Sequence, residues 1–223
     1  MLPPDTPVTA YFIPQGFQSR EYPEYASLAE DEEISLVPFT VNPAYIESAV
    51  HNLRTGLFGR IILDSYMVYR GTDEYVDVKT PAAALSYWYD AMYYDAEKRL
   101  VVGDNTYARA FEMLSEDFLV RIADPMVLVW TREEYEAVSA MVGLTGKVTF
   151  ATVRGDERPP MCEVDMGCRV EYVAEPDPAP FDLVIDPPAD YVPPEKQLVI
   201  RTRSREFIAA KLAAAVCPPV KKK

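Results

Sequence analysis

The order of apolar runs and helical segments between Leu100 and Val153 constrains the fold of this 223-residue chain more than any other feature. Short, mostly apolar runs at 100–103, 126–130 and 147–153 alternate with two segments whose apolar residues recur at helical spacing. Runs of this kind are typical of strands that are covered on both faces. Strands joined through helices form parallel sheets with right-handed crossovers. The sequence therefore predicts a mixed α/β fold with a partly parallel sheet flanked by helices.

The first 43 residues differ from the rest of the chain in their many prolines, which break helices and remove backbone donors. Proline-rich segments favour an extended conformation, and Tyr11, Phe12 and other aromatic residues lie between the prolines. We expect residues 1–43 to form an extended arm that either straps over its own domain or packs on a partner subunit. Residues 44–216 are then a single α/β domain, and residues 217–223 a basic tail.

The charge of the chain argues against two classes of partner. Its formal net charge is -13, whereas nucleic-acid binding depends on Lys and Arg neutralising phosphates, and anionic membranes attract basic segments. No run approaches the roughly 20 apolar residues that span a bilayer. The chain begins without a secretory signal pattern, and three cysteines are too few for a disulfide framework. We expect an intracellular protein that is not secreted and binds neither nucleic acid nor membrane, with a virion as the alternative location.

Thr80 and Pro81 match a helix start, with a capping side chain before a proline at the first helical position. The helix predicted over 81–98 carries one apolar stripe: Leu85, Trp88, Tyr89, Met92 and Ala96. Further tyrosines lie round the same helix, at Tyr87, Tyr93 and Tyr94. Tyr and Trp are favoured at interfaces, so we interpret this Tyr-rich helix either as core or as a contact with a protein partner or a second copy of the chain.

Strands predicted at 60–69 and 74–79, with a turn near Gly71, place two acids and a lysine together. Asp77 and Lys79 are two residues apart on one strand and so face the same way. A two-residue turn puts Asp64 opposite Asp77 or opposite Lys79, according to its register. Two carboxylates can hold Mg²⁺, and a neighbouring lysine could help to position an attacking water.

With these residues, the segment 43–104 resembles the PD-(D/E)xK nuclease family: a helix with Glu47, a strand bearing Asp64, then Asp77-Val78-Lys79 and a further helix. The resemblance implies a metal-dependent nuclease with Asp64 and Asp77 as Mg²⁺ ligands and Lys79 assisting. The chain departs from the pattern in having Leu63 where the family has proline. The later helix also lacks the family's basic or amide residue.

The stretch FDLVIDPPADY resembles the substrate-side motif of amino-group methyltransferases, which implies a role for Asp186. Its aromatic residue, Tyr191, comes two positions late, and the glycine-rich cofactor loop of such enzymes is absent. His51 is the only histidine, and no nucleophile elbow accompanies it. We interpret Cys162 and Cys168 as packed free thiols.

Because no catalytic motif is complete, the first hypothesis is a non-enzymatic interaction or assembly protein without a cofactor. It would be a structural subunit of a larger complex, and a viral one fits. Its protein partner, or a second copy, would bind through the arm and the Tyr-rich helix. The alternative is the Mg²⁺-dependent nuclease, and the third hypothesis is a methyltransferase-like domain.

Overall fold

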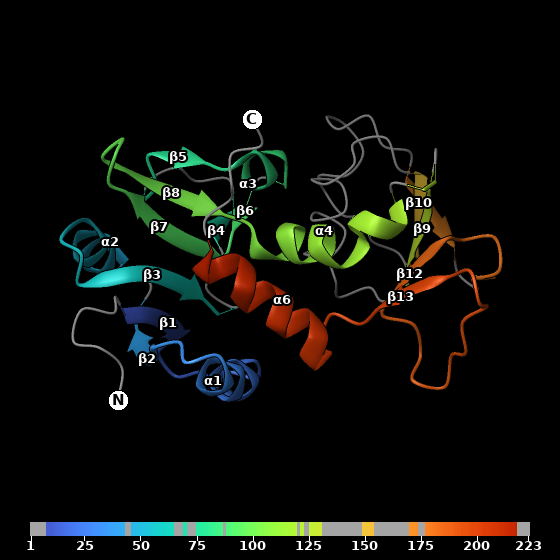
Figure 1. Cartoon of the computed structure of the whole chain (residues 1–223), viewed down its shortest axis with the longest axis horizontal. Helices are drawn as coiled ribbons and strands as arrows, with labels where there is room; N and C mark the ends of the chain where they lie inside the picture. Colours follow the sequence, from blue (N-terminus) through green and yellow to red (C-terminus); the bar gives the residue numbers. More distant parts are fainter. Residues whose placement is uncertain are drawn as a thin grey trace. The chain divides into compact units, whose positions relative to one another are not determined.

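The computed structural model describes residues 8–42, 46–64, 69–70, 75–86, 88–119, 121–122, 125–130, 149–153, 170–173 and 177–217 (Figure 1). The chain divides into two compact units: unit 1 is residues 1–106 with 208–223, and unit 2 is residues 107–207. The predicted α/β fold with a partly parallel sheet flanked by helices is confirmed. The structure differs from the expected single domain over 44–216, because each unit has its own sheet.

Unit 1 is built on a six-stranded sheet in the order β2-β1-β3-β7-β8-β5. Its strands are β1 (Val8–Pro14), β2 (Leu36–Val41), β3 (Phe58–Leu63), β5 (Val78–Lys79), β7 (Ala91–Asp95) and β8 (Leu100–Asp104). Only β7 runs antiparallel to its neighbours. The residue before β7 therefore lies at the same edge of the sheet as the carboxyl ends of the other strands. A separate antiparallel pair joins β4 (Tyr69–Arg70) to β6 (Trp88–Tyr89).

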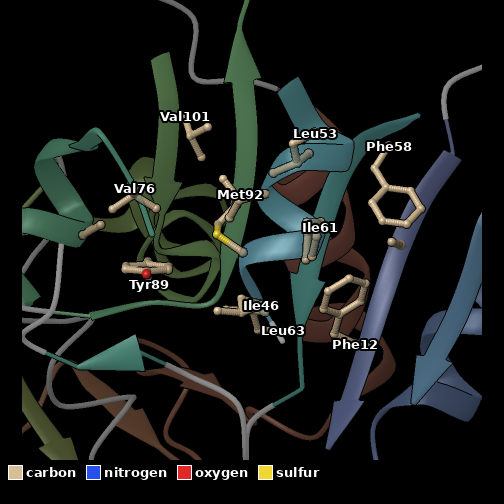
Figure 2. Close-up of a cluster of buried hydrophobic side chains, with 14 residues drawn as sticks. Phe12, Ile46, Leu53, Phe58, Ile61, Leu63, Val76, Tyr89, Met92 and Val101 are labelled. Carbon is tan, nitrogen blue, oxygen red and sulfur yellow. The ribbon is translucent and has the colours of Figure 1, made fainter. Parts of the chain in front are cut away.

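Helices cover both faces of this sheet. Neighbouring strand residues point to opposite faces, so the sheet contributes side chains to two core clusters. One core cluster contains Ile61 and Met92 together with Ile46 and Leu53 of α2 (Ile46–Arg54), as Figure 2 shows. The other contains Ile62 and side chains of α1 (Tyr22–Asp31) and α6 (Arg205–Val216). The remaining helix of this unit, α3, spans Pro81–Ser86.

Unit 2 is built on a five-stranded parallel sheet in the order β11-β10-β9-β12-β13. Its strands are β9 (Met126–Val129), β10 (Thr149–Val153), β11 (Val170–Val173), β12 (Leu183–Ile185) and β13 (Leu198–Ile200). The central strands β9 and β12 are almost wholly buried, which explains their continuous apolar sequence. Most of α4 (Thr106–Leu119) also belongs to this unit.

The structure differs from the expected arm between residues 8 and 41, which form β1, α1 and β2. Strand β1 lies inside the sheet, between β2 and β3. The prolines occupy places where no donor is lost from the sheet or helix. Pro14 ends β1, Pro38 lies in the edge strand β2, and Pro23 lies in the first turn of α1.

The expected helix over 81–98 is wrong beyond Ser86, where α3 ends. Trp88 and Tyr89 form β6, and β7 follows. Aromatic residues favour strands, and β7 pairs with both β3 and β8, so sheet pairing overrides the helical spacing. Trp88 is fully buried, at 0% exposure, but in a strand. Tyr87 lies outside the described residues.

The expected hairpin between strands 60–69 and 74–79 is also not observed. Strand β3 pairs with β1 and β7, whereas β5 pairs with β8. The residues predicted to form its turn lie outside the described residues. The two strands are therefore separated in the sheet by β7 and β8.

Candidate functional site

Polar residues follow the strands of unit 1 at one edge of its sheet. Asp64 follows β3, Asp90 precedes the antiparallel β7, Asp104 ends β8 and Thr80 follows β5. In α/β sheets, ligands bind outside the carboxyl ends of the strands. This edge is therefore the candidate functional site of unit 1.

Backbone hydrogen bonds fix these residues in a row. Leu63 N–H donates to Asp90 O at 2.7 Å, and Asp90 N–H donates to Asp104 O at 3.1 Å. Thr80 N–H donates to Gly103 O at 2.9 Å. A β-carbon on Gly103 would lie 3.0 Å from the Tyr89 ring, so glycine at this position lets that ring pack against β8. The side chains at this edge are thus held by the sheet itself.

The buried charges of the described residues gather at this edge. The buried carboxylates there are Asp64, Asp90 and Asp104, each 1–2% exposed, and the buried cation is Lys211, 4% exposed. Burying a charge is costly unless it is paired and hydrogen-bonded. A sheet edge at which the buried charges gather is therefore a candidate functional site.

Asp64 is held by two hydroxyl groups from the chain segment around β1. Its Oδ2 accepts hydrogen bonds from Tyr11 Oη at 3.2 Å and Ser19 Oγ at 2.5 Å. Ser19 Oγ in turn accepts the backbone N–H of Tyr22 at 3.0 Å, which ties the start of α1 to the same cluster. Burial raises the pKa of Tyr11, and the charges of Glu21 and Asp64 add to this effect.

Asp90 caps the start of α4. Its Oδ1 accepts Thr106 N–H at 2.7 Å, and its Oδ2 accepts the Thr106 hydroxyl at 2.5 Å. Burial raises the pKa of Asp90 to about 6, although Lys211 and the bonds from Thr106 favour its charged form. Asp104 accepts the Thr80 hydroxyl at 2.8 Å and Asn105 N–H at 3.0 Å. Each acid therefore has a defined orientation.

Lys211 reaches this cluster from α6. Ile208, Leu212 and Ala215 pack that helix against the sheet, and Lys211 lies on the same side because it is three residues after Ile208. Its Nζ lies 3.3 Å from Glu21 Oε2 and 5.6 Å from the centre of the Tyr25 ring. Its charge also acts on the pKa of Asp90. Lys211 therefore lies among Glu21, Tyr25 and Asp90.

The Tyr25 hydroxyl is buried in the same place, and the described part of the chain provides no hydrogen-bond partner for it. Burial raises its pKa well above the ordinary value, and the charges of Glu21, Asp90 and Asp64 raise it further. The hydroxyl therefore stays protonated among these carboxylates. Buried polar groups in proteins are almost always bonded, so this donor needs an explanation.

Of the three residues that the sequence placed together, Asp64 belongs to this site and Asp77 does not. Asp77 is exposed and accepts bonds from Arg54 at 3.3 Å and from Val101 N–H at 2.7 Å. Lys79 lies on β5, at the edge of the sheet order. Within the described ranges no three His, Cys, Asp or Glu side chains form a metal site.

Sequence reasoning missed Glu21, Asp90 and Lys211. Two signals could have found part of the set. Acids directly follow apolar strand residues at Leu63-Asp64 and Gly103-Asp104. In addition, Lys211 is the one charged residue in the otherwise apolar stretch 207–217.

The comparisons with known proteins connect this architecture with dehydrogenases. No protein-family model matches the chain, and no curated protein matches it. Solved structures do match, among them a shikimate 5-dehydrogenase from Listeria monocytogenes in complex with shikimate and NAD. It shares 11% identity over 94% of this chain and 90% of its own, with a TM-score of 0.65.

Two further structures have the same fold. A shikimate 5-dehydrogenase from Mycobacterium fortuitum is 14% identical over 97% of this chain and 93% of its own, with a TM-score of 0.66. The 5-ketofructose reductase of Gluconobacter sp. strain CHM43 is 14% identical over 95% of this chain and 85% of its own, with a TM-score of 0.63. The chain therefore has the two-unit fold of these dehydrogenases.

These likenesses correct four expectations from the sequence. The resemblance to PD-(D/E)xK nucleases is wrong, and so is the Mg²⁺ cofactor of that alternative. The hypothesis of a non-enzymatic structural or viral assembly protein is wrong, because the fold is that of oxidoreductases. The same likeness does not support the methyltransferase hypothesis either. The expectation of no cofactor is corrected too, since a protein of this fold was crystallised with NAD.

Two other expectations concern a protein partner and the membrane. The predicted protein partner or second copy stays a prediction. No helix of the described residues is long and apolar enough to cross a membrane.

Unit 2 has the topology of a nucleotide-binding sheet. Numbered in chain order, its strands run 3-2-1-4-5, the order of the dinucleotide-binding fold, with the switch point between β9 and β12. The usual fingerprint is a glycine-rich turn after the first strand, where the backbone approaches the pyrophosphate. Here Trp130 follows β9, and the sequence has no glycine between Trp130 and Gly143.

Side chains of unit 2 bind one another at this switch point. The Trp130 ring lies 5.9 Å from the Tyr191 ring. Asp186, in a left-handed conformation at φ 49°, accepts Thr202 N–H at 2.7 Å and the Thr202 hydroxyl at 2.5 Å. The topology fits a nicotinamide nucleotide, but the residues after β9 do not fit the usual pyrophosphate turn.

Proposed function

We propose that the chain is an intracellular oxidoreductase that acts on a small hydroxylated or keto substrate at the sheet edge of unit 1. A nicotinamide nucleotide is the proposed cofactor, by analogy with the dehydrogenases of the same fold. One observation carries the proposal: three buried carboxylates, a buried lysine and a buried tyrosine hydroxyl meet at the carboxyl edge of one sheet. Substrate sites of α/β sheets occupy that edge.

Lys211 is the residue proposed to exchange a proton with the substrate. When a carbonyl is reduced, its oxygen takes up a proton, and a buried ammonium is a suitable donor. Glu21, at 3.3 Å, orients the Lys211 ammonium, and Asp90 lies near it. The Tyr25 hydroxyl would donate a hydrogen bond to the substrate. Asp64 and Asp104 would accept bonds from substrate hydroxyls.

The test is activity with defined probes. Shikimate with NAD⁺ or NADP⁺, and 5-ketofructose with NADH or NADPH, are followed at 340 nm with the purified full chain. We expect Lys211→Met to lower the rate about 100-fold to 10,000-fold, the usual range for a proton-transfer residue. Lys98→Met is the control, because Lys98 is exposed and pairs only locally, at 3.0 Å from Asp95. Full activity of Lys211→Met, or no turnover of any probe, would overturn the proposal.

The nucleotide is tested separately, by calorimetric titration of NADH and NADPH into the wild-type chain. Because the sequence has no glycine between Trp130 and Gly143, we expect binding weaker than in enzymes that hold pyrophosphate through a glycine-rich turn. Saturation in the low micromolar range would contradict this expectation while leaving the roles in unit 1 intact.

A further inference from the structure

We infer that the site in unit 1 takes a neutral polyhydroxylated substrate, a polyol or keto-sugar, and discriminates against carboxylates. This inference rests on the proposed function, because it names the substrate class of the same site. Its two observations are the sign of the buried charge and the buried hydroxyl of Tyr25.

The buried charge of the site is strongly negative. Asp64, Asp90 and Asp104 supply three buried carboxyl groups and the partly exposed Glu21 a fourth, whereas Lys211 supplies one buried ammonium. A substrate carboxylate would add a further negative charge to this buried cluster, where like charges repel more than in water. A neutral substrate avoids that repulsion.

The single buried cation among the described residues is already engaged. Lys211 Nζ lies 3.3 Å from Glu21 Oε2, and its charge stabilises the ionised form of Asp90. Lys211 could neutralise a substrate carboxylate only by weakening these two interactions. A substrate carboxylate would therefore compete with Glu21 and Asp90 for the Lys211 ammonium.

The same groups suit hydroxyls. Each oxygen of Asp90 accepts one hydrogen bond from Thr106, and a carboxylate oxygen can accept two. The Tyr25 hydroxyl is a buried donor without a partner in the described chain, and it lies within the field of Glu21, Asp90 and Asp64. A polyol hydroxyl both donates and accepts hydrogen bonds. It can therefore accept one from the Tyr25 hydroxyl and donate one to Asp90.

The experiment compares ligands that differ in one carboxylate. The pairs are sorbitol with gluconate and fructose with 2-ketogluconate, and binding to the full wild-type chain is measured by saturation-transfer NMR and calorimetry. We expect the neutral member of each pair to bind at least about tenfold more tightly. Equal or tighter binding of the acid would overturn the inference and leave the proposed function standing. If no member of either pair binds, both fail.

A charge variant sharpens the same experiment. Glu21→Gln removes one carboxylate and releases Lys211 from its pair. We expect the acids to gain about tenfold in affinity while the neutral ligands change little. Glu24→Gln is the matched control, because Glu24 is exposed on the same helix, α1. An unchanged preference in Glu21→Gln, or an equal change in Glu24→Gln, would contradict the electrostatic argument.

Discussion

The carboxyl edge of the sheet in unit 1 collects buried charge, whereas the corresponding edge in unit 2 is filled by side chains that bind one another. In unit 1, Asp64, Asp90 and Asp104 are buried at this edge together with Lys211, and the Tyr25 hydroxyl there has no hydrogen-bond partner among the described residues. In unit 2, Trp130 packs against Tyr191, and Asp186 is bonded twice to Thr202.

Both sheets offer the place where α/β proteins bind ligands, so topology alone does not say which edge carries the chemistry. Among the described residues, the two edges differ in whether their buried polar groups have hydrogen-bond partners. Unit 1 buries several charges and leaves the Tyr25 hydroxyl without a hydrogen-bond partner in the described chain, which costs stability. We therefore place the substrate in unit 1, and the predictions below probe this contrast from the largest expected effect to the smallest.

The two tryptophans give the largest contrast in stability, with one in each unit. Trp88 is fully buried in unit 1, whereas Trp130 is partly exposed in unit 2. We expect Trp88→Ala to lower the free energy of unfolding by about 3–5 kcal/mol, as for other emptied aromatic sites. Trp130→Ala should cost about 1–2 kcal/mol, because less surface is lost. Urea denaturation of both variants, followed by circular dichroism, measures the difference, and equal costs would contradict the burial argument.

The raised pKa of Asp90 gives the next effect. Its pKa is about 6 in the folded chain against an ordinary value of 3.8. Between these values the folded state binds more protons than the unfolded state, so this group's contribution to stability is present at low pH and falls as the pH rises through 6. At 1.36 kcal/mol per pKa unit, the full change is about 3 kcal/mol.

Asp90→Asn removes this titration and keeps an oxygen that can accept Thr106 N–H. Relative to the variant, the wild-type chain should therefore lose stability between pH 3.5 and pH 7, as measured by urea denaturation at each pH. Asp95→Asn is the control with the opposite sign, because bonds from Lys98 lower the pKa of the partly exposed Asp95. If the difference in unfolding free energy between wild type and Asp90→Asn does not vary with pH, the pKa of Asp90 is not raised.

The sequence predicts unit 2 better than unit 1, for a physical reason. In unit 2 every strand is parallel and reached through a crossover, so runs such as Met126–Val129 are apolar throughout and easily recognised. In unit 1 an antiparallel strand, β7, is inserted between parallel neighbours, and its AMYYD sequence also fits a helical stripe. Only tertiary pairing decides between the two.

The candidate site could be predicted only in part. Asp64 was singled out, but with the wrong neighbours, because the predicted hairpin joins strands that β7 and β8 separate. Lys211 is 190 residues from its partner Glu21, and no local spacing connects them. A site assembled from strand ends far apart in the sequence becomes visible only when the sheet order is known.

The smallest expected effect on stability distinguishes two tyrosines of unit 1. Tyr11 Oη donates to Asp64 at 3.2 Å, whereas Tyr25 Oη has no partner in the described chain. We expect Tyr11→Phe to cost about 1–3 kcal/mol, since it removes a bond to a buried charge. Tyr25→Phe should change the free energy of unfolding by less than about 0.5 kcal/mol, or stabilise the fold, because removing an unsatisfied buried hydroxyl relieves its desolvation cost. If the hydroxyl is kept for a ligand, Tyr25→Phe should also weaken sorbitol binding while leaving the fold intact. A large loss of stability in Tyr25→Phe would mean that its hydroxyl is bonded within the chain, and unit 1 would then lose the donor that sets its edge apart from that of unit 2.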